Sequence, residues 1–181
     1  TGMYMIDWDL RSGQEGGVNG SEYLQTVDAF AHWFRQQKFV CHVYTFTDIM
    51  KQINRNMHGD DPSYYRLPQE RELAAQYLLL YEMSLPYGLD LNNILNVDKS
   101  ATRIIITTSN MGTRALSELD NRIQAWLGAN MPETMHSSGT GISIVFAYLS
   151  ERNIINMLLA ALGAIVAISI ILGLALRRID M

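Results

Sequence analysis

The side chains that could hold a metal ion or form a redox site are spread thinly along the chain. The four histidines show no metal-ligand spacing, and we expect each to be a surface or interface residue: His32, His42, His58 and His136. Cys41 is the only cysteine, which excludes an internal disulfide and CxxC chemistry. The run HGDD at residues 58–61 could contact a cation, but it lacks the EF-hand spacing. A helix end followed by an Asp-Pro turn explains it better.

Residues that could act as a nucleophile or an acid–base pair are equally weak candidates. Ser137 and Ser138 lie in a Gly-rich segment without the nucleophile elbow of a hydrolase. Asp7 and Asp9 are two apart on a predicted strand, so their side chains point the same way, and we expect that direction to be solvent. The sequence therefore predicts a protein that is not an enzyme and that takes no metal and no cofactor.

Charge and composition argue against a nucleic-acid partner. The chain of 181 residues has a net charge of −4 and a pI near 5.5, so it has no global basic field. Its nine tyrosines and three tryptophans are scattered, and no cluster of lysine or arginine interleaves with them. The length predicts one domain with a hydrophobic core plus an appendage.

The appendage is a C-terminal segment at residues 153–176, NIINMLLAALGAIVAISIILGLAL. It has no charge, and its only polar side chains are Asn153, Asn156 and Ser169. As a helix rising ~1.5 Å per residue it spans roughly 36 Å, enough for the ~30 Å hydrocarbon core of a lipid bilayer. Residues 151–181 are therefore predicted to form one transmembrane helix and a short cytoplasmic end.

The flanking charges predict the orientation of this helix. Arg177 and Arg178 follow it, whereas Glu151 and Arg152 precede it, so the positive-inside rule places the C-terminus in the cytoplasm. Residues 1–150 are then expected in the periplasm, outside a bacterial inner membrane. The N-terminal residues lack the basic start and the apolar stretch of an export signal. We expect either that a signal peptide has been removed or that a preceding membrane helix delivers the domain.

One side of the predicted membrane helix has small residues. They would let another helix approach closely, because packing in lipid depends on shape: Ala160, Gly163, Ala164 and Ala167, then Gly173. The alternative is that alanine and glycine are simply common in membrane helices. Both interpretations stay open at this point.

Residues 1–150 have the pattern of an α+β domain. Alternating apolar side chains predict half-buried strands, and apolar residues three and four apart predict amphipathic helices. In chain order the predicted elements are strand 3–10, helix 21–34, strand 40–46, strand 101–109, helix 113–130 and strand 141–149. Two βαβ halves predict a ferredoxin-like split βαβ sandwich with a helical insertion at about 48–96. The last predicted strand leads into the membrane helix with almost no linker, so rigid coupling is expected.

The stretch ELAAQYLLLYEMSLPYG at residues 72–88 is apolar without a clean polar face. It is too short for a membrane span, since only about 14 Å of helix separates its two glutamates. A core helix is one interpretation. The other interpretation is that one side of the helix packs on the domain while its second side contacts a neighbouring loop, a subunit or a hydrophobic substrate. The residues proposed for that contact are Tyr77, Leu78, Leu79 and Tyr81.

The segments HGDDPSYYRLP and ELAAQYLLLYEMSLPYGLDLNNILNVDKSATRIIITTSN, with a membrane helix ending LALRRIDM, resemble the resistance-nodulation-division (RND) exporters. The resemblance covers nearly the whole chain, and residues 58–108 are its most specific part. Within that superfamily the chain is most similar to the hydrophobe/amphiphile "predicted exporter" group, which is related to the MMPL and hopanoid transporters.

The resemblance implies that residues 1–150 form the second of two periplasmic porter loops, and that the following helix is the eighth of twelve. It implies proton-driven export of hydrophobic or amphiphilic molecules, with the other membrane helices of the exporter as partners. No proton relay carries over, because residues 153–176 contain no ionisable side chain.

Two descriptions of the whole protein stay open. The chain is either a portion of a complete exporter or a short RND-like protein that serves as a single-span accessory subunit of a membrane complex. A membrane-anchored enzyme with a ferredoxin-like domain is a third hypothesis, and its best site would use His58, Asp60 and Asp61.

Overall fold

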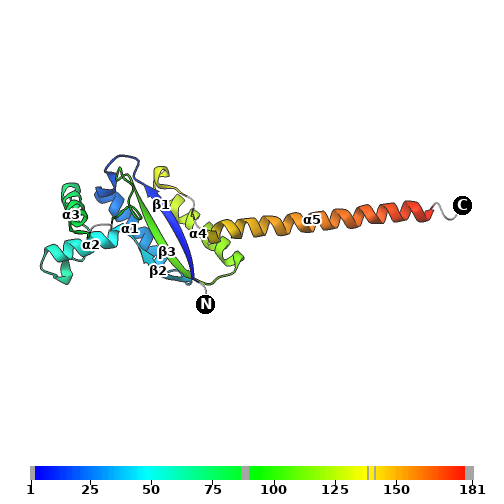
Figure 1. Cartoon of the computed structure of the whole chain (residues 1–181), viewed down its shortest axis with the longest axis horizontal. Coiled ribbons are helices and arrows are strands. Elements are labelled where there is room, and N and C mark those ends of the chain that lie inside the picture. The colour runs from blue at the N-terminus through cyan, green and yellow to red at the C-terminus, as the bar shows by residue number, and fades with distance from the viewer. Residues whose placement is uncertain (1–2, 87–89, 138, 141, 178–181) are drawn as a thin grey trace.

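The computed structural model describes residues 3–86, 90–137, 139–140 and 142–177. A three-stranded antiparallel sheet packs against helices, and one long helix leaves it toward the C-terminus (Figure 1). In chain order the elements are β1 (Met3–Arg11), η1 (Gly17–Asn19), α1 (Ser21–Arg35), β2 (Val40–Tyr44), α2 (Phe46–Met57), η2 (Pro62–Tyr64), α3 (Arg71–Ser84), β3 (Ala101–Ser109), α4 (Thr113–Asn130), η3 (Glu133–Met135) and α5 (Ile142–Arg177).

The sheet has the order β1–β3–β2, and β3 is antiparallel to both neighbours. β1 and β3 pair in one unbroken register, from Met3 opposite Ser109 to Arg11 opposite Ala101. Because side chains alternate along a strand, one face of the sheet receives the apolar residues, and these are buried: Ile6, Trp8, Leu10, Val43, Ile104 and Ile106. The three strands predicted in these regions are confirmed.

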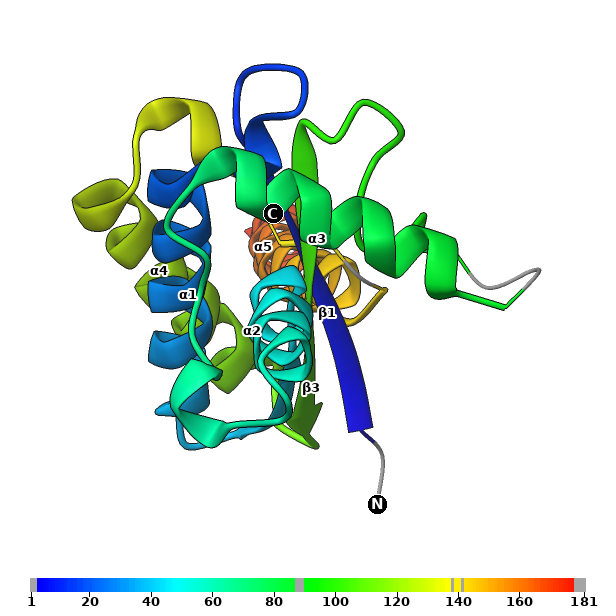
Figure 2. The ribbon, with the colours of Figure 1, turned by 90° about the vertical axis from the view of Figure 1, so that its left-hand side faces the viewer.

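Helices α1 and α4 cover this apolar face together (Figure 2). Their apolar residues recur three and four apart and are buried: Leu24, Val27, Ala31 and Phe34 in α1, and Leu116, Leu119, Ile123 and Leu127 in α4. Phe30 joins the two helices, because its ring centroid lies 4.9 Å from that of Trp126 and 4.5 Å from that of Phe34. Trp8 of β1 packs on Phe34 at 5.5 Å, so the aromatic cluster also ties the helices to the sheet.

Between β2 and β3 the chain forms the helices of the insertion. The hydroxyl of Thr45 caps α2 by accepting a hydrogen bond from the main-chain N–H of Asp48 at 3.3 Å. α3 packs on α2, and the hydroxyl of Tyr77 donates to Asn54 Oδ1 at 3.2 Å. The Asn54 amide in turn donates to the carbonyl of Arg66 at 2.9 Å, which holds the connection before α3. Both helices lie at the end of the domain opposite α5 (Figure 1).

The prediction of a strand at residues 141–149 is wrong. From Ile142 onward the chain is helical, as the first part of α5. The apolar residues of this run fit both patterns, because Ile142, Phe146 and Leu149 are four and three apart, as in a helix. Helix formation is cooperative, and no proline separates the run from the apolar helix that follows, so the run extends that helix. The predicted boundary at residue 150 therefore falls inside a continuous helix.

In the described part of the segment between η3 and α5, one residue bridges to the sheet. Thr140 and Asp7 exchange two main-chain hydrogen bonds, at 2.8 and 2.9 Å, on the free edge of β1. α5 then starts against α4 and β1 (Figure 1). The domain and α5 are thus joined by two main-chain hydrogen bonds and by helix packing, and the described residues form no fourth strand there.

Candidate functional site

The outer part of α5 is apolar and exposed along its length. No residue of the apolar window in Asn153–Gly173, 21 residues with a mean hydropathy of 2.6, is buried. At ~1.5 Å per residue this segment is roughly 31 Å long, about the thickness of the hydrocarbon core of a bilayer. Its hydroxyl group is satisfied internally, since Ser169 Oγ donates to the carbonyl of Ile165 at 2.8 Å. Among the described residues, α5 is the one helix long and apolar enough to cross a membrane.

The small residues of the predicted packing stripe lie on this bare helix, and all of them are exposed: Ala160, Gly163, Ala164, Ala167 and Gly173. A Cβ added at Gly163 or Gly173 would meet nothing within 4 Å. No described part of the chain covers the stripe, so the space beside it is open to another helix.

Two of the four residues predicted to contact a partner face the interior instead. Tyr77 and Leu78 are 5 % and 1 % exposed, because they form the inner side of α3. Tyr81 is half-buried, and only Leu79, 55 % exposed, lies fully on the surface. α3 does have a second apolar side, but it consists of Leu79, Leu80 and Met83.

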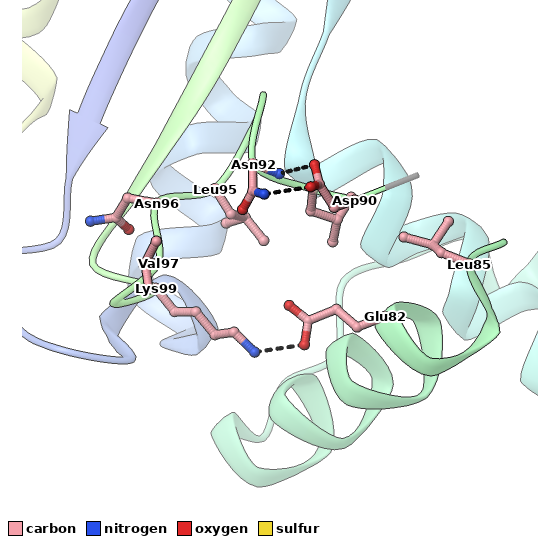
Figure 3. Close-up of a pocket in the computed structure, with 9 residues that line it drawn as sticks. Glu82, Leu85, Asp90, Asn92, Leu95, Asn96, Val97 and Lys99 are labelled. Carbon is pink, nitrogen blue, oxygen red and sulfur yellow. Dashed lines mark hydrogen bonds and ion pairs between the residues drawn. The ribbon is translucent and has the colours of Figure 1, made fainter. Parts of the chain in front are cut away.

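A cleft of about 400 Å³ lies beside this surface, between the C-terminal half of α3 and the connection that precedes β3 (Figure 3). Its buried part is apolar and is formed by Leu91 and Leu95, with half-buried Leu85. Polar side chains line it as well, with exposed Val97 among them: Glu82, Asp90, Asn92, Asn96 and Lys99. The cleft therefore combines an apolar base with charged edges.

An ion pair crosses this cleft. Lys99 Nζ lies 2.7 Å from Glu82 Oε2, and about a third of each side chain is exposed. Lys99 has a φ of 51°, a left-handed conformation that costs a non-glycine residue roughly 1–2 kcal/mol. Main-chain hydrogen bonds hold it there, because Val18 N–H donates to the Lys99 carbonyl at 3.2 Å and Gly16 N–H to that of Asp98 at 3.0 Å. The β1–α1 connection thus fixes the edge of the cleft from which the ammonium reaches α3.

Asp90 supplies a second carboxylate, away from the Glu82–Lys99 pair (Figure 3). It accepts hydrogen bonds from the main-chain N–H of Asn92 at 3.1 Å and from the Asn92 amide at 2.5 Å. Within the described ranges no cation pairs with it. The described residues of the lining hold two carboxylates and one ammonium, a net charge of −1.

The four histidines lie in four separate environments. His32 and His42 are exposed on α1 and β2. The ring of His58 stacks on that of Tyr64 with centroids 3.8 Å apart, and His136 Nε2 lies 3.0 Å from two carbonyl oxygens at the end of α4. In the portion of the chain that is described, no three His, Cys, Asp or Glu side chains come together to hold a metal ion.

The carboxylates of the HGDD run serve the local fold. Asp60 Oδ1 lies 3.5 Å from Arg55 Nε. Asp61 Oδ1 accepts the main-chain N–H of Ser63 at 2.9 Å, and that hydrogen bond lowers the pKa of Asp61 below its ordinary value. Gly59 and Asp60 have φ values of 68° and 63°, so the chain turns in the left-handed region where α2 ends. These contacts are those of a helix end followed by a turn.

Asp7 and Asp9 share a side of β1, as the alternation predicts, but that side is not fully open to solvent. Both are half-buried, and Asp9 Oδ1 accepts a hydrogen bond from Arg103 Nε at 2.9 Å. Burial raises the pKa of Asp7 above its ordinary value, although the charge of Arg103 opposes the shift. Ser137 Oγ is buried without a hydrogen-bond partner among the described residues, and Ser138 lies outside them.

The cleft residues could not be recognised from the sequence. Glu82 and Lys99 are 17 positions apart, and no spacing rule predicts that a helix side chain and a loop side chain meet over that separation. The left-handed backbone of Lys99 also has no signature in its residue type. One signal was available: Glu82 follows Leu79 by three positions, which places a carboxylate next to an apolar side chain on the surface of a helix.

Comparisons with known proteins do not assign this chain to a family. No protein-family model matches it, and no curated protein is significantly similar to it. The geometry defines a broad class: an α+β domain with a three-stranded antiparallel sheet, continued by an apolar helix long enough to span a membrane.

Proposed function

We propose that the chain is the porter-type portion of an RND-type exporter, which moves hydrophobic or amphiphilic molecules out of the cell with the proton gradient and has no enzymatic activity. The observation that supports this most strongly is the junction between domain and helix. α5 starts against β1 and α4 and continues as a bare apolar helix. Such a junction can pass the movement of a membrane helix directly to the domain, which alternating access requires.

In this proposal the domain is a variant of the ferredoxin-like split βαβ fold. The order β1–β3–β2, with β3 antiparallel to both neighbours, agrees with three of the four strands of that fold. The fourth strand would lie along the free edge of β1, where Thr140 bridges to Asp7. The first turns of α5 take the place of that strand in the chain.

The proposal places α5 across a bacterial inner membrane, with the domain in the periplasm and the C-terminus in the cytoplasm. Arg177 and Arg178 follow the apolar segment and support this orientation. Residues 153–173 have no ionisable side chain, so the proton path lies in other membrane helices. One of those helices would pack on the small-residue stripe: Ala160, Gly163, Ala164 and Ala167.

The outer side of α3 and the cleft are the parts of the domain that suit an amphiphile. Leu79, Leu80 and Met83 can contact an apolar chain, and the charged edge of the cleft can contact a headgroup. α3 lies at the end of the domain opposite α5 (Figure 1), and the cleft lies beside its C-terminal half. A substrate bound there would be held away from the bilayer.

The mass of the native polypeptide tests the exporter proposal. An antibody against the domain, applied to denatured membranes of the source cell, is expected to detect a band of about five times the 20.5 kDa of this chain, because the remaining helices and loops belong to the same polypeptide. A band at 20.5 kDa would exclude the exporter and favour the second candidate.

That second candidate is a single-span RND-like accessory subunit of a larger membrane complex. The uncovered stripe on α5 favours it equally, since a helix that packs there can belong to another polypeptide. Its partners would be the lipid bilayer and other membrane subunits. Purification from native membranes in mild detergent would then retain those subunits with the chain.

A further inference from the structure

We propose that the cleft beside α3 binds the cationic head of an amphiphile, while the alkyl chain of that amphiphile lies on Leu79 and Met83. The inference rests on the proposed function only in treating the ligand as an exported substrate. The binding site itself follows from the charges and the apolar surface that surround the cleft.

The net charge of the cleft lining favours a cationic head group over an anionic one. Glu82 already compensates the ammonium of Lys99 at 2.7 Å, whereas no cation pairs with Asp90 among the described residues. A cationic head brings the net charge of the lining from −1 to zero. An anionic head would meet the uncompensated carboxylate of Asp90 and would have to compete with Glu82 for Lys99, so the cleft rejects it by repulsion.

The end of α3 adds to the same preference. Leu85 is the C-cap of α3 and lines the cleft, so the cleft lies next to the C-terminal end of this helix. The C-terminus of a helix has a partial negative charge equivalent to about half an elementary charge. No basic side chain occupies the last turn of α3, so this partial charge is available to a ligand.

The apolar surface accounts for the rest of the ligand. The volume of about 400 Å³ is within the range of small-molecule sites and holds a quaternary ammonium head with the first carbons of its chain. Leu91 and Leu95 form the base on which those carbons rest. Leu79, 55 % exposed, is the i−3 neighbour of Glu82 on the surface of α3, and Met83, 76 % exposed, is the i+4 neighbour of Leu79, so an apolar surface begins next to the cleft.

Binding can be measured on the full chain in nanodiscs of uncharged lipid. Val97 is 87 % exposed on the edge of the cleft, so an environment-sensitive fluorophore on the Cys41→Ser/Val97→Cys variant reports occupancy there. The probes are decyltrimethylammonium, decyl sulfate and decyl maltoside, each below its micelle concentration, because they share one chain length and differ only in the head. We expect a saturable signal with decyltrimethylammonium at a concentration on the order of tenfold lower than with either of the others.

A charge-inverted cleft provides the decisive comparison. Adding Glu82→Gln and Asp90→Asn to the labelled variant leaves Lys99 as the one charge of the lining, so we expect decyl sulfate to become the preferred probe. Glu118→Gln, at an exposed position on α4, is the matched control and should leave the preference unchanged. Equal responses to the three heads, or a cation preference that survives the double substitution, would overturn the inference, with circular dichroism verifying that each variant is folded.

The outcomes separate this inference from the proposed function. Cation-selective binding together with a native band at 20.5 kDa would keep the site and exclude the exporter. A band about five times larger without cation selectivity would keep the exporter and exclude the site.

Discussion

Replacing Leu162 and Val166 together by arginine is expected to release the chain from membranes. The two residues lie one turn apart near the middle of Asn153–Gly173 and are 62 % and 52 % exposed, so both new charges would face lipid. One arginine at the centre of a membrane helix costs about 2.5–3.5 kcal/mol, and the pair therefore about 5–7 kcal/mol. Apolar residues contribute only about 0.3–0.6 kcal/mol each, so the pair offsets most of the free energy that favours insertion.

Carbonate extraction of the 181-residue chain, expressed behind a cleavable export signal, measures this effect. The wild-type chain should sediment with the membranes, and most of the arginine variant should appear in the supernatant or in lipid-free aggregate. The Leu162→Ala/Val166→Ala variant removes the same side chains without adding charge and should stay in the membrane. An arginine variant that resists extraction as fully as the alanine variant would show that this part of α5 does not face lipid.

Replacing Phe30 by alanine is expected to have the largest effect on the stability of the domain. Its ring is fully buried and contacts Phe34 at 4.5 Å and Trp126 at 4.9 Å, so the substitution leaves a cavity where α1, α4 and the sheet meet. A change of this kind costs about 3–5 kcal/mol, which is a large part of the stability of an ordinary domain. Phe30→Leu keeps most of the volume and should cost less than about 1.5 kcal/mol.

Urea unfolding in detergent, followed by tryptophan fluorescence, isolates this effect. The three tryptophans all lie in the domain, so the signal does not depend on the membrane helix. Phe39→Ala is the control, because that ring is 40 % exposed and its loss should change the free energy of unfolding by less than about 0.5 kcal/mol. If Phe30→Ala were no more destabilising than Phe39→Ala, the aromatic cluster could not be what joins α1 to α4.

The elements that the sequence predicts correctly are those with one clear period. β1 alternates Ile6, Trp8 and Leu10 toward the core, and β3 alternates in the same way against it. α1 and α4 place apolar residues three and four apart, and both helices form where this spacing predicts. In each case burial of one face decides the conformation, and the spacing of the buried residues is visible in the sequence.

The error at residues 141–149 has a different physical origin. The apolar residues there satisfy both the strand period and the helix period, so the pattern alone does not decide. The outcome depends on the neighbouring segment, because a long apolar helix extends into a compatible run at little cost. A cooperative contribution of this kind does not appear when each window of sequence is considered separately.

The candidate site could be predicted only in part. The apolar character of α3 was evident, but which of its sides is buried depends on where α2 lies. Tyr77 is buried against α2, where its hydroxyl group donates a hydrogen bond to Asn54. Leu79 is exposed because it lies on the side of α3 that faces away from α2. The cleft depends further on Lys99, whose side chain is aimed by a left-handed backbone and by hydrogen bonds from the β1–α1 connection.

That α5 crosses the membrane and holds the domain outside is tested most directly by the thiol of Cys41. This cysteine is exposed on β2, so a membrane-impermeant maleimide can reach it wherever the domain is accessible. In spheroplasts that have not been lysed, we predict rapid labelling of Cys41, whereas the Cys41→Ser/Asp180→Cys variant should be labelled only after lysis. Protection of Cys41 until lysis, or labelling of both positions in intact spheroplasts, would contradict a periplasmic domain joined to a membrane-spanning α5.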